Sequence, residues 1–362
     1  MTALPDRLAE RTLELVDIPS ESGHEKRIRE HLRGLVPDGL QLEFAGDEAL
    51  LFVPERRPGA PFVVLAGHYD TVPAQDNLPG RIADGAVHGL GASDMKGGLA
   101  VAIELVRGLG ALGALPYDVG LLLFGREELP AEHNPLPALL TGSLAIHDAA
   151  LVVLLEPTDG TLQAGCLGNV VARATFHGTG GHSARPWAAK NAIALAVDAL
   201  GPILAHPPRE AVVGGLRFVE TVTPTRIEAG VADNVIPSEA SVTLNLRYAP
   251  DRSPAEAEAA LQSLLPESAA LEIVGNAAAA RVISDTPPVA ALRASGGLAL
   301  EPKLAWTNVA DFTAAGIDAV NFGPGHTALA HHRDERVAIA ALTHSYETLW
   351  RFLTGAMGED AS

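Results

Sequence analysis

The stretch LLLFGREELP (residues 121–130) joins an apolar run to a glycine turn and two adjacent glutamates. Four consecutive apolar residues that end at a glycine predict a buried strand and the loop that leaves it. The carboxylates of Glu127 and Glu128 at such a strand end repel each other unless a positive group lies between them. An isolated pair of glutamates more often lies in a solvated loop than in a functional site. The rest of the chain therefore has to show which of the two this pair belongs to.

The same pattern, an apolar run followed by polar residues, recurs on both sides of this stretch. The runs PFVVLAGHYD (61–70), ALVVLLEP (150–157) and DAVNFGPG (318–325) predict further strands. Helices are predicted before and between them, for example over 5–17 and 99–112. Continuous apolar strands separated by helices indicate an α/β fold, a mainly parallel sheet with helices on both faces.

From about residue 168 the pattern changes to strands that alternate apolar and polar residues. These strands are NVVARATFHG (169–178), TPTRIEAG (223–230) and ASVTLNLRYA (240–249). Together with two predicted helices they indicate an α+β sandwich whose sheet is open on one face. We therefore predict two domains, a discontinuous α/β domain (1–167 and 283–362) and an inserted α+β domain (168–282).

The composition favours a globular protein that binds neither nucleic acid nor a membrane. Of the 362 residues, 47% are hydrophobic and 19% are charged, and 44 acidic against 26 basic residues give a net charge of −18. Binding to phosphates needs clustered Lys and Arg, which this balance does not favour. An anionic substrate would need a locally cationic pocket.

The cysteine count and the first helix bear on the cellular compartment. Cys166 is the one cysteine, which excludes an internal disulfide and fits a reducing compartment. The first helix carries acidic residues rather than a basic and then apolar leader, and the apolar runs are far shorter than the roughly 20 residues of a membrane span. We expect a cytoplasmic protein.

Potential metal ligands follow several of the predicted strands. They are His68 and Asp70, Asp94 in a glycine-rich turn, Glu127 and Glu128, Glu156, and the neighbours His331 and His332. In an open α/β sheet the carboxyl ends of the strands form a crevice where such residues converge. Imidazole and carboxylate ligands without thiolate suit zinc and tolerate Co²⁺ or Mn²⁺. The set exceeds the needs of one tetrahedral ion and predicts two ions bridged by a carboxylate.

Six motifs in this order resemble the co-catalytic zinc aminoacylase/carboxypeptidase family over nearly the whole chain. They are GHYDTVP (67–73), GASDMKGG (91–98), REE (126–128), EPT (156–158), GTGGHSARP (178–186) and AHHRDE (330–335). The resemblance implies a zinc-peptidase-like catalytic domain that hydrolyses amide bonds of small N-acyl amino acids, with an inserted dimerisation or lid domain. Within the family, several further segments are most similar to actinobacterial succinyl-diaminopimelate desuccinylases.

The resemblance also implies roles for the candidate ligands. His68 and Glu156 would bind one zinc ion, Glu128 and His331 the other, and Asp94 would bridge them. Glu127 would be the general base, and Asp70 would orient His68, as carboxylates commonly do for a ligating histidine. His331 is preferred over His332 because Glu335 follows it in the family's H-x-x-x-E pattern, and His326 matches no family position.

The inserted domain carries further residues that resemble family positions. His182 would stabilise the oxyanion in the active site of a partner subunit, which implies a homodimer. Arg185, Asn234 and Arg247 would contact substrate carboxylates, for which Arg is suited by bidentate pairing, although each Arg could instead form a structural salt bridge. Thr307 and Asn308 are predicted at the rim of the pocket.

Other functions fit the motifs less well. The glycine-rich turn lacks the P-loop pattern, and its position for the third glycine of G-x-G-x-x-G is Asp94. No G-x-S-x-G of a serine hydrolase occurs. A non-catalytic relative would have little reason to keep both Glu127 and Asp70. Another amide hydrolase of the same family, an acetylornithine deacetylase, dipeptidase or carboxypeptidase, remains the alternative. Leu90, where many relatives carry Arg, leaves the acyl group less certain than the reaction.

Overall fold

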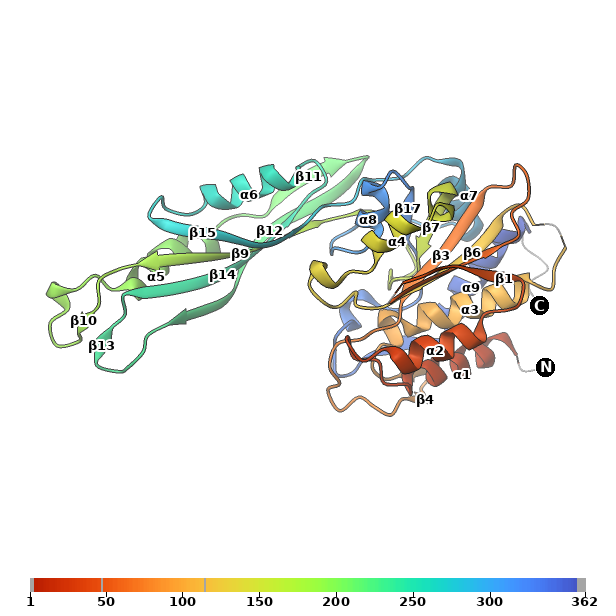
Figure 1. The fold of residues 1–362 in the computed structure, drawn as a ribbon, viewed down its shortest axis with the longest axis horizontal. Coiled ribbons are helices and arrows are strands. Elements are labelled where there is room, and N and C mark those ends of the chain that lie inside the picture. Colours follow the sequence, from red (N-terminus) through yellow and green to blue (C-terminus); the bar gives the residue numbers. More distant parts are fainter. Residues whose placement is uncertain (1–2, 47, 114, 357–362) are drawn as a thin grey trace. The chain divides into compact units, whose positions relative to one another are not determined.

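The computed structural model describes residues 3–46, 48–113 and 115–356. Contacts between residues divide the chain into two compact units. Unit 1 comprises Met1–Ala164, Ile283–Glu301 and Asp311–Ser362, and unit 2 comprises Gly165–Val282 and Pro302–Ala310. Each unit has a sheet of its own (Figure 1).

Unit 1 is built on an eight-stranded mixed sheet. In spatial order its strands are β1 (Leu40–Ala45), β2 (Ala49–Pro54), β6 (Asp118–Phe124), β3 (Phe62–His68), β7 (Ala149–Leu154), β17 (Ala319–Asn321), β8 (Leu162–Cys166) and β16 (Leu300–Lys303). The four central strands β6, β3, β7 and β17 run parallel to one another. Every residue of β3 and β6 is buried, because these apolar strands are covered on both faces.

Helices cover this sheet and confirm the predicted α/β class. They are α1 (Leu4–Val16), α2 (Lys26–Leu35), α3 (Gly97–Leu109), α4 (Leu136–Gly142), α7 (Pro287–Gly296), α8 (Val309–Ala314) and α9 (Ile339–Thr354). In Figure 1, α1, α2, α3 and α9 lie together on one side of the strands, and α4 lies on the other. Helix α3 packs directly against β3 and β6, which are the strands that lead to the candidate ligands.

Short elements complete unit 1 beside the central sheet. A three-stranded sheet contains β18 (Arg336–Ala338), β5 (Ala86–His88) and β4 (Arg81–Ala83). The short helices are η1 (Ala92–Lys96), η2 (Ala131–His133), η3 (Ala145–Asp148) and η5 (Thr327–Leu329). The antiparallel pairing of β18 with β5 joins the segment after His331 to the segment before Asp94.

Unit 2 is an α+β sandwich, as predicted from its alternating strands. Its antiparallel sheet has the order β11 (Arg209–Val213), β12 (Leu216–Ala229), β14 (Glu239–Tyr248), β9 (Gly168–His177) and β15 (Ala269–Ala277). Helices α5 (Ala192–Leu204) and α6 (Pro254–Ser263) pack on one face of the sheet. Small elements at one end are β10 (Gly181–His182), β13 (Val235–Ile236) and η4 (Pro186–Ala188).

The core of unit 2 follows the strand period of two residues. In β14 buried residues alternate with partly exposed ones, and the buried set packs against α5 and α6. The opposite set, which includes Thr243, Asn245 and Arg247, is polar and lies on the face that the helices leave open. This open face is where polar side chains can reach a ligand without crossing the core.

The boundaries of unit 2 differ from the predicted inserted segment, 168–282. The unit begins three residues earlier, at Gly165, and also includes Pro302–Ala310, which the sequence assigned to the α/β domain. Hydrogen bonds explain this grouping. Leu167 N–H donates to Lys303 O (3.2 Å), and Trp306 Nε1 donates to Ala278 O (3.1 Å). Such contacts between distant segments leave no periodic signal in the sequence.

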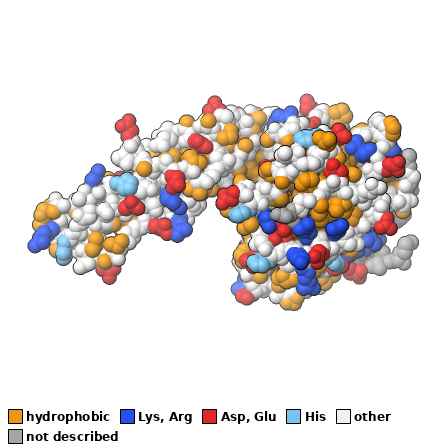
Figure 2. All heavy atoms as spheres, viewed as in Figure 1, with side chains coloured by type: hydrophobic (Ala, Val, Ile, Leu, Met, Phe, Trp, Pro, Cys, Tyr) orange, Lys and Arg blue, Asp and Glu red, His pale blue; other side chains and the backbone are white. Residues whose placement is uncertain are grey.

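Two surface properties bear on the expected partners. Figure 2 shows Asp and Glu side chains spread over both units on the face in view, beside Lys and Arg side chains. Within the described part of the chain, no helix combines the length and the apolar character that crossing a membrane requires.

Candidate metal centre

The two carboxylate oxygens of Asp94 face two different histidines. Oδ1 lies 3.1 Å from Nε2 of His68, and Oδ2 lies 3.6 Å from Nε2 of His331. The three side chains come from three separate segments of unit 1. The carboxylate of Asp94 therefore lies between the imidazoles of His68 and His331.

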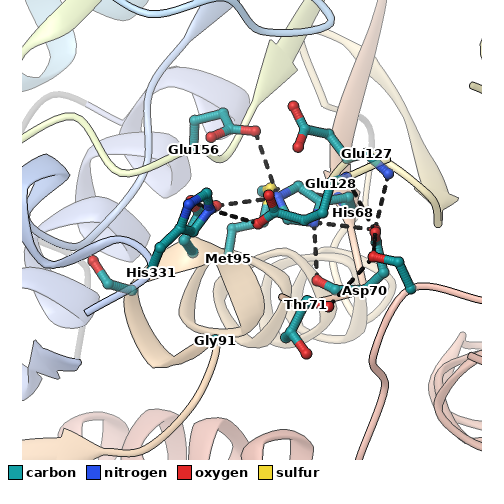
Figure 3. A network of polar contacts seen from close by, with 12 residues as sticks. His68, Asp70, Thr71, Gly91, Met95, Glu127, Glu128, Glu156 and His331 are labelled. Atoms are coloured by element: carbon teal, nitrogen blue, oxygen red, sulfur yellow. Dashed lines mark hydrogen bonds and ion pairs between the residues drawn. The ribbon is translucent and has the colours of Figure 1, made fainter. Parts of the chain in front are cut away.

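A glutamate completes each side of this arrangement (Figure 3). Glu156 Oε1 lies 3.8 Å from His68 Nε2, and Glu128 Oε1 lies 2.8 Å from His331 Nε2. One ligand atom each from His68, Asp94 and Glu128 lie within 4.8 Å of one another, close enough to hold a metal ion. The result is two His–Glu pairs with Asp94 between them.

The parallel strands bring these residues together. His68 is the last residue of β3, Glu128 follows the end of β6 by four residues, and Glu156 follows the end of β7 by two. Strand β3 lies between β6 and β7, so the three carboxyl ends are neighbours. This is the edge where sites of open α/β sheets form. The side chain of His68 is 1% exposed, whereas that of His331 is 51% exposed.

Asp70 is a buried acceptor that holds several groups of the site in place. Its carboxylate accepts hydrogen bonds from Ser22 Oγ (2.6 Å) and from the backbone N–H groups of Glu127 (3.1 Å) and Glu128 (3.2 Å). Oδ1 also lies 3.4 Å from Nδ1 of His68. Burial by itself would raise the pKa of Asp70, but the contacts with His68, Ser22 and Glu128 outweigh it and lower this pKa.

The surrounding charges favour a positive ion in the centre. Burial disfavours the charged form of His68, but the nearby carboxylates of Asp70 and Asp94 raise its pKa well above the usual value. The hydrogen bond with Glu128 raises the pKa of His331 to about 9. Burial raises the pKa of Glu127; His68 opposes this shift, and neighbouring carboxylates including Glu156 add to it.

This donor set fits divalent metal ions. Imidazole nitrogens and carboxylate oxygens are the ligands that zinc, cobalt and manganese accept. Because the carboxylates outnumber the imidazoles, a divalent cation would also offset their mutual repulsion. His68, Glu156, Asp94, Glu128 and His331 are the residues that would hold it, and Glu127 stands beside them.

The alternatives for the second histidine behave differently. His332 Nδ1 accepts the N–H of Asp334 (3.1 Å), which lies two residues later in the same segment. His326 lies in a loop, where its Nδ1 is 3.1 Å from Asp159 Oδ1. The structure thus brings His331, and not these two, to the centre.

The predicted oxyanion-stabilising His182 and two predicted substrate contacts, Arg185 and Asn234, lie together at one end of unit 2. His182 in β10 pairs with Val235 in β13, and the N–H of Ser183 donates to the carbonyl of Asn234 (3.0 Å). The N–H of Arg185 donates to the carbonyl of His182 (2.8 Å). All three predicted residues have exposed side chains. His182 Nδ1 accepts the N–H of Ala184 (3.1 Å), so the ring carries its proton on Nε2.

Arg247 is separated from this group within the chain. It lies eight residues after Glu239 along β14, a span of roughly 27 Å at the rise of an extended strand. The two-stranded ribbon of β10 and β13 lies at the Glu239 end (Figure 1). One chain therefore does not bring Arg247 and Asn234 together, although the sequence assigned them to one pocket.

Thr307 and Asn308, predicted at the rim of the pocket, belong to the segment that groups with unit 2. The two residues are 3% and 1% exposed. Hydrogen bonds from Leu167 N–H to Lys303 O and from Trp306 Nε1 to Ala278 O attach this segment to the rest of unit 2. The place of Thr307 and Asn308 at the rim stays a prediction.

Sequence reasoning missed some residues that contact the predicted ones. In unit 1, Ser22 donates to Asp70, and the N–H of His68 approaches the sulfur of Met95 at 3.4 Å. In unit 2, Asn245 Oδ1 accepts from Arg247 Nε (3.0 Å). Only Asn245 carried a signal, because it lies two residues before Arg247 and therefore on the same face of a strand.

Comparison with known proteins shows the family to which this chain is similar. A family model described as "Peptidase family M20/M25/M40" matches residues 64–355. A curated relative from Corynebacterium glutamicum, named succinyl-diaminopimelate desuccinylase, is 36% identical over 352 residues, which cover 95% of each chain. A relative from Mycobacterium tuberculosis, given the same enzyme name provisionally, is 37% identical over 353 residues, 96% of this chain and 98% of its own.

The solved structures support the fold. The aminopeptidase PepT from Bacillus cereus matches with a TM-score of 0.76 at 19% sequence identity, covering 97% of this chain and 98% of that one. At this identity the match bears on architecture alone.

Proposed function

The chain belongs to peptidase family M20/M25/M40, and from that premise we propose that it is a succinyl-diaminopimelate desuccinylase. This metal-dependent amide hydrolase would add water to N-succinyl-LL-diaminopimelate and release succinate and LL-diaminopimelate, a step of lysine biosynthesis. The observation that carries the proposal is Asp94, whose two oxygens face separate His–Glu pairs beside Glu127. The full-length relatives give the substrate.

We propose two zinc ions as the cofactor, for which cobalt or manganese can substitute. His68 and Glu156 would hold one ion, Glu128 and His331 the other, and Asp94 would contact both. When bound, such ions polarise a carbonyl group and lower the pKa of water. Asp70 keeps His68 in its ligating orientation through the contact with Nδ1, and this leaves Nε2 to face the centre.

Glu127 is the proposed general base. It would accept the proton of the attacking water while the oxygen of that water bonds to the acyl carbon. It would then donate the proton to the departing nitrogen when the C–N bond breaks, which leaves a carboxylate and an amine. A carboxylate at this position can both accept the proton and return it, and the two steps require a group that does both.

His182 is proposed to stabilise the oxyanion of the tetrahedral intermediate. With its proton on Nε2, the ring has one N–H to donate to a developing negative oxygen. Since His182 and Asn234 lie far from Arg247 along unit 2, a site that uses both groups needs a second chain. We therefore propose a homodimer in which these two residues serve the partner's site.

Arg247 is the proposed anchor for a substrate carboxylate. Burial lowers the pKa of Arg247, and only its Nε donates to Asn245, which leaves the rest of the guanidinium for a ligand. The substrate carries three carboxylates and one free amine, so cationic contacts matter in a chain of net charge −18. Arg185 is proposed as a second carboxylate contact. The cytoplasmic location stays a prediction.

The decisive experiment compares substrates for the zinc-loaded enzyme. Succinyl-diaminopimelate should be hydrolysed with a much higher kcat/KM than acetylornithine or neutral dipeptides. Chelation should abolish the activity, zinc or cobalt should restore it, and metal analysis should find about two ions per chain. Faster turnover of acetylornithine or of a dipeptide would overturn the proposed substrate, but the assignment as an amide hydrolase would stand. Activity that survives removal of all divalent metal would overturn both.

A further inference from the structure

The side chain of Glu335 is buried against the loop that carries Asp94. It is 2% exposed and accepts three backbone hydrogen bonds. Oε2 accepts the N–H of Gly91 (2.9 Å), and Oε1 accepts those of Ser93 (2.9 Å) and Asp94 (3.0 Å). Three amides of one short loop thus converge on a single carboxylate from the other end of the chain.

Other hydrogen bonds of this loop leave these three amides to Glu335. Lys96 N–H donates to Gly91 O (2.7 Å), and Ser93 Oγ donates to the carbonyl of His326 (3.2 Å). Asp94 has φ −125° and ψ 94°, which is not a helical conformation, and Gly91 is left-handed at φ 77°. Buried amides without acceptors are costly. Glu335 supplies the acceptors for the amides of Gly91, Ser93 and Asp94, so it helps to fix the path of the backbone that presents Asp94.

The same segment carries a candidate ligand of its own. His331 lies four residues before Glu335, and the carbonyl of Glu335 accepts the N–H of Gly89 (3.0 Å). Strand β18, which follows directly, pairs with β5. The loop of Asp94 and the segment of His331 are therefore attached to each other by the Glu335 side chain, by this backbone hydrogen bond and by the pairing of β18 with β5.

We propose that Glu335 is a positioning residue that holds Asp94 between the two His–Glu pairs and thereby sets the affinity of the centre for its metal ions. It touches neither substrate nor metal and acts through the backbone of Asp94. A carboxylate shared between two ions must direct one oxygen to each side, and a small rotation of the loop would lose one of these contacts. This inference rests on the proposed metal-dependent function and adds the residue that organises the centre.

The test replaces Glu335 without changing its size. Glu335→Gln retains one acceptor oxygen but turns an NH₂ group toward backbone donors. In the full-length chain, hydrogen exchange at residues 91–94 should become faster, with and without added zinc. Zinc affinity, measured by competition with a chelator, should fall by about 10- to 100-fold for at least one ion. At saturating zinc, kcat should largely recover, and KM should stay close to that of the wild type.

Asp118→Asn is the matched control. Asp118 is also buried, at 3% exposed, and also accepts a backbone N–H, that of Arg57 (2.8 Å), but it lies at the opposite end of β6 from Glu128. This variant should leave zinc affinity and the exchange of 91–94 unchanged. A shortened carboxylate, Glu335→Asp, serves as the second variant and should fall between the wild type and Glu335→Gln in both measurements.

Two results would overturn the inference. One is wild-type zinc affinity and wild-type exchange at 91–94 in Glu335→Gln. The other is an equal loss of zinc affinity in Asp118→Asn, which would reduce the role of Glu335 to general stability. Failure of the proposed function is separate, because it would appear in the wild-type enzyme as metal-independent activity or as another preferred substrate.

Discussion

At the scale of single residues, the neighbours Glu127 and Glu128 have different surroundings and different proposed roles. The N–H groups of Glu127 and Glu128 both donate to the carboxylate of Asp70, which fixes the loop. Their side chains nevertheless leave the backbone in different directions, and Glu128 reaches His331 (Figure 3). Arg126, with φ 60°, provides the left-handed turn that precedes them. One glutamate can therefore bind metal while the other exchanges a proton.

This arrangement predicts different losses for the two glutamates. Glu127→Gln keeps the shape but cannot accept a proton, so turnover should fall by about 10² to 10⁴ or more while zinc content stays near that of the wild type. Glu128→Ala should lose about one zinc ion per chain. Zinc analysis and steady-state kinetics on both variants check this. Similar zinc loss in the two would contradict the assigned roles.

Asp118 predicts a pH dependence of stability away from the metal centre. Burial would raise its pKa, but the hydrogen bonds from the backbone and side chain of Arg57 and from Arg56 outweigh it and lower this pKa. A carboxyl with a lower pKa in the folded state stabilises the fold above its unfolded value of about 3.9, and this stabilisation is lost as the pH falls through the folded pKa.

The expected result is a stability difference that disappears in acid. Asp118→Asn should lower the free energy of unfolding by about 1 to 2 kcal/mol at pH 7, a modest value because both arginines are partly exposed. The difference should shrink as the pH drops below about 4. Urea unfolding of both metal-free proteins across pH measures it. A difference that stays constant from pH 7 to pH 3 would exclude the ionic contribution.

At the scale of elements, close packing of α3 against the end of β7 supports the candidate ligands Asp94 and Glu156. Helix α3 begins directly after the loop of Asp94, and its Gly98 lies against the end of β7. A Cβ at Gly98 would lie 2.3 Å from the carbonyl oxygen of Leu155, which directly precedes Glu156. In contrast, a Cβ at Gly34 in α2 would meet no atom within 4 Å.

These two helical glycines form a matched pair of substitutions. Gly98→Ala should destabilise the protein by about 1 to 3 kcal/mol, because backbone atoms cannot move aside easily, and should weaken zinc binding through Glu156. Gly34→Ala should instead stabilise it by about 0.5 to 1 kcal/mol through helix propensity. Denaturant unfolding and zinc titration report both effects. Unchanged zinc affinity in Gly98→Ala would separate this contact from the metal centre.

At the scale of the whole molecule, the proposed dimer makes a prediction about mixed subunits. His182→Ala and Glu127→Ala should each be nearly inactive alone. If subunits exchange, half of the dimers are mixed and each has one intact site, so activity should return to about a quarter of the wild type. Mixing Glu127→Ala with Glu128→Ala is the control and should restore nothing. A fully active monomer in sedimentation would contradict the proposal.

The sequence by itself determined what depends on local periodicity. Continuous apolar runs predicted the buried strands β3, β6 and β7, and strict alternation predicted the half-open sheet of unit 2, because both patterns reflect how many faces of a strand are covered. Polar residues at the strand ends marked His68, Glu128 and Glu156 as neighbours, since parallel strands end at one edge.

Only the tertiary structure decided how distant segments meet. In the structure the two carboxylate oxygens of Asp94 face different histidines, and Glu335 accepts hydrogen bonds from the loop of Asp94. Arg247 and Asn234 lie far apart along unit 2. The structure also groups 302–310 with unit 2. These outcomes depend on the free energy of satisfying buried amides and charges across the chain, and that free energy has no period along the sequence.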